Sequence, residues 1–139
     1  MTRYLLDTNV VSEVRRPRPD PGVLRWLEAA RGDDLYLSVL TIGEIRLGIV
    51  RLERRDPARA EALEAWLAGL EQGYAERILP VTAAVVRRWA ALSAERPLPV
   101  VDALLAATAA EQDATLVTRN VADLAGVDVP LLNPFGAGD

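Results

Sequence analysis

The sequence predicts an α/β protein built on a parallel sheet, and two observations carry this prediction. Short runs of apolar and branched residues alternate with longer segments whose apolar residues recur every three or four positions. The first pattern is typical of buried strands and the second of helices, so their alternation favours parallel strands with helices on both faces. The 139 residues are 50% hydrophobic and contain no repeat or long linker, so we expect one domain over 1–139.

Each element follows from its own local pattern. Strands are predicted at 3–6, 35–39, 77–81, 114–120 and 130–134, which gives a sheet of four or five strands. Helices are predicted at 8–14, 22–31, 40–56, 57–74, 82–96 and 100–112, with a helical turn at 121–126. Proline supports several boundaries: Pro57 occupies the first turn of one helix and Pro97 stops another.

Composition excludes several kinds of chemistry. The chain has no cysteine and no histidine, and all sixteen of its basic residues are arginine. Thiolate nucleophiles, catalytic triads, and lysine-dependent nucleotide binding or Schiff-base chemistry are therefore unavailable. No apolar stretch reaches the ~18 residues of a membrane helix, and the start lacks signal-peptide features. We expect a cytoplasmic protein that does not enter a membrane.

The formal net charge of −4 argues against a nucleic-acid partner at first sight, because phosphate binding usually relies on surplus positive charge. The argument weakens if part of the acidic charge holds divalent cations. A bound cation reverses the local sign of the charge.

Carboxylates follow the predicted strands where a ligand site is expected. Open parallel sheets bind ligands beyond the carboxyl ends of their strands, where the strand order reverses. Asp7 ends the first strand, and Thr118, Arg119, Asn120 and Asp123 follow the fourth. If these two strands are neighbours, the five residues converge.

Two further acidic residues stand alone among apolar neighbours. Glu44 lies early in the helix after the second strand, beside its apolar stripe, and Asp102 begins an otherwise apolar helix. A charge in such surroundings is costly unless it is paired or binds metal. Structural alternatives exist, because Asp7 could cap a helix and Asp102 could oppose a helix dipole. Asn120 with Asp123 could likewise cap one turn.

The candidate carboxylates favour metal-assisted hydrolysis of a phosphodiester. Several carboxylates close together need cations to remain ionised. Ligands that offer only oxygen select hard ions, so Mg²⁺ or Mn²⁺ is expected. Such ions activate water and stabilise charge at a phosphodiester during in-line displacement.

Four motifs, "LLDTNVVSE", "LTIGEIRLG", "VDALLAATA" and "LVTRNVADL", resemble those of the PIN-domain ribonucleases, and among them the VapC-like toxins of toxin–antitoxin pairs. The resemblance spans nearly the whole chain, with the motifs in the family's order. The last motif departs from the family pattern, because Leu124 stands where phenylalanine often follows the aspartate.

The resemblance implies a three-layer α/β/α sandwich around a parallel sheet. It implies a metal-dependent endoribonuclease that cuts RNA, is neutralised by a cognate antitoxin protein and often forms a homodimer. Carried over residue by residue, it implies a catalytic metal site made of four acidic residues and orienting roles for four polar ones. The acidic residues are Asp7, Glu44, Asp102 and Asp123, and the supporting residues are Thr8, Asn9, Thr118 and Asn120.

Two arginines are candidate phosphate contacts. Arg46 lies two residues after Glu44, and Arg119 lies beside Asn120. One guanidinium group can bind two oxygens of a phosphate at once. For both arginines, a solvated or ion-paired surface side chain is an equally good interpretation.

Two other functions are compatible with parts of the pattern. A phosphatase-type α/β enzyme also places aspartate after its first strand, but it usually requires a second acidic residue nearby and a lysine, which are missing here. A non-catalytic PIN-like module would bind RNA or a partner without cutting. The presence of all four acidic residues favours the enzyme.

Overall fold

A five-stranded parallel sheet forms the centre of the protein in the computed structural model, which describes residues 2–136. Its strands are β1 (Tyr4–Leu6), β2 (Leu35–Ser38), β3 (Ile78–Leu79), β4 (Thr115–Val117) and β5 (Leu131–Leu132). Their order across the sheet is β3-β2-β1-β4-β5, and every pair is parallel. The predicted parallel α/β fold is confirmed, whereas the predicted domain 1–139 extends past the described residues at both ends and stays a prediction.

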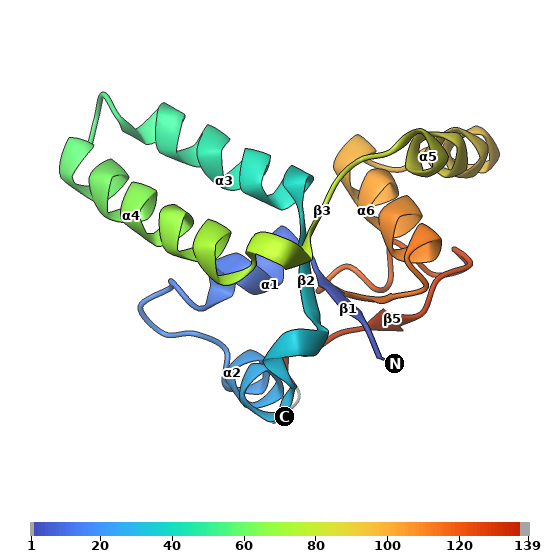
Figure 1. Cartoon of the computed structure of the whole chain (residues 1–139), viewed down its shortest axis with the longest axis horizontal. Coiled ribbons are helices and arrows are strands. Elements are labelled where there is room, and N and C mark those ends of the chain that lie inside the picture. Colours follow the sequence, from blue (N-terminus) through green and yellow to red (C-terminus); the bar gives the residue numbers. More distant parts are fainter. Residues whose placement is uncertain (1, 137–139) are drawn as a thin grey trace.

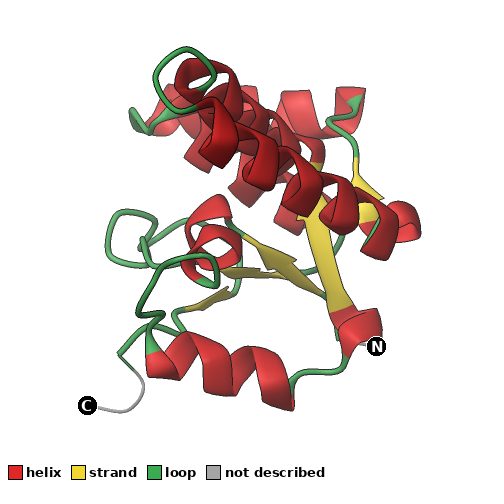
Figure 2. Cartoon of the chain, turned by 90° about the vertical axis from the view of Figure 1, so that its left-hand side faces the viewer, coloured by secondary structure: helices red, strands yellow, loops and turns green. Residues whose placement is uncertain are grey.

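Helices cover both faces of the sheet (Figures 1 and 2). They are α1 (Thr8–Glu13), α2 (Pro21–Ala29), α3 (Val39–Leu52), α4 (Pro57–Gly73), α5 (Ala83–Glu95) and α6 (Val100–Glu111), with short 3-10 helices at Gly32–Asp34 and Ala75–Arg77. No helix within the described part of the chain is long and apolar enough to cross a membrane.

The two cores follow from the alternation of side chains along each strand. Leu6 packs with residues of α1, α2, α3 and α4, while its neighbour Leu5 packs with residues of α6. The same alternation places Val117 in the first core and Leu116 in the second. Successive strand residues point to opposite faces, so one strand supplies both cores and the three-layer sandwich results.

Local capping explains where two helices begin. The predicted helix 40–56 is shorter in the structure, where α3 ends at Leu52 and a turn follows. Asp56 then caps α4 by accepting a hydrogen bond from the Arg59 backbone N–H at 3.2 Å. Asp20 caps α2 in the same way, through the N–H groups of Gly22 and Val23. The segment 121–126 forms consecutive turns rather than a helix, and Gly126 has the positive φ of +89° that favours glycine.

The strand order places the candidate site. The chain crosses from β1 to β2 on one side and later returns to β4 on the other, so β1 and β4 flank the point where the order reverses. The backbone N–H of Asp7 donates to the Val117 carbonyl at 2.9 Å. The residues after both strands therefore share one edge of the sheet.

Candidate active site

Asp7 is a buried carboxylate held by a neighbouring strand. It is 5% exposed, and its Oδ2 accepts a hydrogen bond from Thr118 Oγ1 at 2.8 Å. Asn9 Nδ2 lies 3.4 Å from the same oxygen. Although Asp7 precedes α1, its side chain accepts no capping hydrogen bond from that helix. Helix capping therefore does not explain this aspartate.

The polar residues predicted to support the site join β1 to β4. Thr118 is fully buried, and its Oγ1 accepts from the Asn120 N–H at 3.0 Å while it donates to Asp7. Asn9 Oδ1 accepts from the Arg119 N–H at 3.3 Å. Thr118 and Asn9 therefore both contact the Oδ2 atom of Asp7, and each is itself held by a backbone N–H of the segment after β4.

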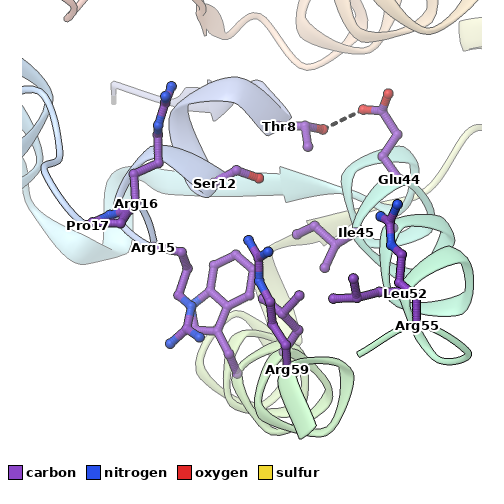
Figure 3. A pocket seen from close by; sticks show the side chains of 13 residues that line it. Thr8, Ser12, Arg15, Arg16, Pro17, Glu44, Ile45, Leu52, Arg55 and Arg59 are labelled. Atoms are coloured by element: carbon purple, nitrogen blue, oxygen red, sulfur yellow. Dashed lines mark hydrogen bonds between the residues drawn. The ribbon is translucent and has the colours of Figure 1, made fainter. Parts of the chain in front are cut away.

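Glu44, on α3, is connected to the site by a hydrogen bond from Thr8. Thr8 Oγ1 lies 2.5 Å from Glu44 Oε1 and 3.1 Å from Thr41 Oγ1, and Figure 3 shows the first of these contacts. Glu44 is exposed, so the predicted desolvation cost of a charge beside the apolar stripe of its helix is wrong. Thr41 is fully buried and was not predicted. Its position three residues before Glu44, on the same side of a helix, was the available signal.

The acidic residues influence one another electrostatically. Burial raises the pKa of Asp7 above its usual range, and the charges of Asp102 and Glu44 raise it further, against the lowering effect of the Thr118 hydrogen bond. Burial also raises the pKa of Asp102, and Glu44 and Asp123 add to the effect. All four predicted carboxylates therefore lie within electrostatic reach of at least one other.

The four acidic side chains are near one another but do not form a coordination site. Within residues 2–136, no three acidic side chains stand close enough together to hold one ion as they are arranged. Glu44 is turned to Thr8, and Asp123 is exposed in the turn that follows β4. The backbone carbonyl of Asp123 accepts from Arg96, which fixes the main chain of this turn.

The two candidate phosphate contacts differ in their surroundings. Arg46 forms an ion pair with Glu64, with Nη1 2.6 Å from a carboxylate oxygen, which favours the ion-paired interpretation of this residue. Arg119 lies beside the site, and its guanidinium covers the Phe135 ring at 4.2 Å from the centroid. Arg119 is exposed and remains available to a phosphate.

The fold and this edge define a class of proteins: parallel α/β proteins that gather carboxylates at the reversal point of the sheet. Residues 4–128 match the model of the PIN domain family. The chain belongs to the PIN domain family, and the predicted resemblance is confirmed.

Named relatives cover nearly the whole chain. The toxin FitB of Neisseria gonorrhoeae is 34% identical over 138 residues, which span 94% of this chain and 97% of FitB. The VapC ribonuclease Y4jK of Sinorhizobium fredii is 32% identical over 143 residues, covering 94% and 96% of the two chains. The crystal structure of FitAcB from N. gonorrhoeae superposes with a TM-score of 0.85 at 34% identity, covering 94% of this chain and 97% of the other.

Proposed function

We propose that this protein is a divalent-metal-dependent endoribonuclease that acts as a toxin and hydrolyses RNA phosphodiester bonds. The observation that carries the proposal is the buried Asp7, held by Thr118 and electrostatically coupled to Asp102 and Glu44. A charge placed at such cost needs a compensating cation. Relatives named as a toxin and as VapC ribonucleases support the reaction and the biological role.

The donor set fits Mg²⁺ or Mn²⁺. Asp7, Glu44, Asp102 and Asp123 offer only carboxylate oxygens, which hard divalent ions prefer. A cation would also relieve the repulsion that raises the pKa of Asp7 and Asp102. When bound, it supplies activation of water and stabilisation of charge on the phosphodiester.

The remaining polar residues act by orientation. Thr118 and Asn9 both donate to Oδ2 of Asp7, and Thr8 donates to Glu44. Asn120 donates to Thr118 and so fixes the hydroxyl that donates to Asp7. The backbone N–H of Arg119 donates to Asn9, so this residue borders the set, and its exposed guanidinium is suited to a phosphate oxygen of the RNA.

An antitoxin protein and a second copy of the chain are the proposed protein partners. Similar chains occur in a toxin–antitoxin complex from Klebsiella pneumoniae, at 26% identity and a TM-score of 0.69, and in the FitAcB structure. The second copy is proposed from the resemblance to the VapC-like toxins. Three exposed apolar side chains of α3 are candidates for its contact surface: Val39, Leu47 and Val50, at 42%, 47% and 54% exposure.

Cleavage of a labelled RNA pool tests the proposal. The purified chain is incubated with Mg²⁺, with Mn²⁺ or with chelator, beside Asp7→Asn and Asp102→Asn. Asp33→Asn is the matched control, because Asp33 is exposed on a 3-10 helix outside the site. We expect cuts that require metal, persist in the control and disappear in both site variants. Folded protein that binds metal and RNA but leaves RNA intact would indicate a non-catalytic module instead.

A further inference from the structure

A pocket of about 590 Å³ adjoins the acidic side chains of the site. Thr8 and Glu44 line the pocket and also contact each other in the site, so the two are continuous (Figure 3). Four arginines also line this pocket, which we call the arginine pocket: Arg15, Arg16, Arg55 and Arg59. They come from the segment after α1, the turn after α3 and the start of α4.

Most of this positive charge has no internal partner. Arg16 lies 3.6 Å from Glu13, whereas Arg15, Arg55 and Arg59 form no ion pair with any carboxylate among residues 2–136. The chain as a whole carries a net charge of −4. Unpaired guanidinium groups gathered in one concave place in an acidic protein create a local attraction for anions.

Internal contacts hold part of the pocket in place. The Arg15 guanidinium covers the Trp66 ring at 5.6 Å from its centroid. Glu13 is 6% exposed and accepts a hydrogen bond from the Asp20 N–H at 2.8 Å, which ties the two ends of the segment carrying Arg15 and Arg16. A positioned guanidinium loses less conformational freedom when it binds a phosphate.

We propose that the arginine pocket binds the phosphates of the RNA strand beside the bond that is cut, an inference that rests on the proposed function. Guanidinium groups match phosphate oxygens, and the volume of the pocket suffices for a nucleotide-sized group. The neighbouring carboxylates repel RNA, so a strand in the site needs positive charge from an adjoining surface. The arginine pocket supplies this charge on the side of Glu44.

Binding of a short fluorescent single-stranded RNA, measured by anisotropy in chelator over a series of salt concentrations, tests the proposal without cleavage. The test variant is Arg55→Gln with Arg59→Gln, and the control is Arg25→Gln with Arg87→Gln. All four arginines are exposed, and each double variant loses two positive charges. We expect about tenfold weaker binding for the test variant alone. We also expect its salt slope to fall by about 1.4, because each contact to a single strand contributes about 0.7.

The outcomes separate this inference from the proposed function. Equal affinity and equal salt slope for the two double variants would overturn the phosphate site, even if the parent cuts RNA with metal. Equal RNA binding by the two double variants is also the result expected if the pocket binds a peptide of the antitoxin and not RNA. A selective loss in the test variant supports the site even if the parent cuts nothing, and in that case only the proposed reaction fails. Circular dichroism checks folding, and the single substitutions Arg55→Gln and Arg59→Gln serve if the double variant unfolds.

Discussion

Replacing Thr118 by valine removes the hydrogen bond that holds the central carboxylate while preserving the shape of the side chain. Thr118 is fully buried, Asp7 is 5% exposed, and the bond between them is 2.8 Å long. A buried hydrogen bond to a charged group contributes about 1.5 to 3 kcal/mol. The Asn120 N–H also loses its acceptor, which costs about 1 kcal/mol. We expect the free energy of unfolding to fall by about 2.5 to 4 kcal/mol at neutral pH.

Urea denaturation of the metal-free protein measures this loss. With a slope of about 2 kcal/mol/M, the midpoint should fall by about 1 to 2 M. The hydrogen bond stabilises the ionised form of Asp7 and so lowers its pKa, against the burial that raises it. The deficit of the variant is therefore complete above the pKa of Asp7 in the folded variant, which is the higher of the two, and shrinks as the pH falls from there through the pKa of Asp7 in the folded parent.

Thr108→Val is the matched control for this substitution. Thr108 is also fully buried, but its hydroxyl donates to the Leu104 carbonyl within α6 at 2.7 Å, a neutral acceptor. We expect a loss of about 1 kcal/mol or less, with the same value in acid. A Thr118→Val deficit that is equally small, or that does not change with pH, would refute the role assigned to this hydrogen bond.

Three further predictions concern the site, the core and a helix cap. Asp7→Asn should reduce RNA cleavage at least about a hundredfold and raise the melting temperature in chelator. Because the pKa of Asp7 is raised in the folded protein, its contribution to stability is largest at low pH and is lost as the pH rises through that pKa. Asparagine does not ionise, so the variant does not lose this stability at neutral pH. A lower melting temperature would contradict the argument. Leu67→Ala should cost about 3 kcal/mol in urea unfolding, because Leu67 is fully buried, and should leave cleavage per folded molecule unchanged. Three backbone N–H groups hold the pKa of Asp20 below its usual range although desolvation opposes them. The resulting stability is present above the unfolded pKa and is lost as the pH falls through the lowered one, so the melting temperatures of parent and Asp20→Asn should converge in acid. A constant difference would argue against this cap.

Periodicity, helped by the proline boundaries, was sufficient to predict the fold class from the sequence. Short apolar runs such as "YLL" and "TLV" indicate buried strands because they alternate with longer segments of helical periodicity. The same reasoning made the convergence of Asp7 and Thr118 conditional on the first and fourth strands being neighbours, since parallel neighbours place their carboxyl ends at one edge. The pairing of Leu6 with Val117 meets this condition.

Only the tertiary structure decided how each polar side chain is used. From the sequence, Asp7 could either cap a helix or belong to a site. In the structure its carboxylate accepts a hydrogen bond from Thr118, which lies 111 residues away. Burial of Glu44 was predicted from its neighbours along the helix, but exposure depends on what packs against that helix. The arginine pocket joins residues of α4 to the segment after α1, more than 40 positions apart. Periodicity reports which face of an element is buried, whereas contacts between side chains distant in sequence are fixed only when the elements pack.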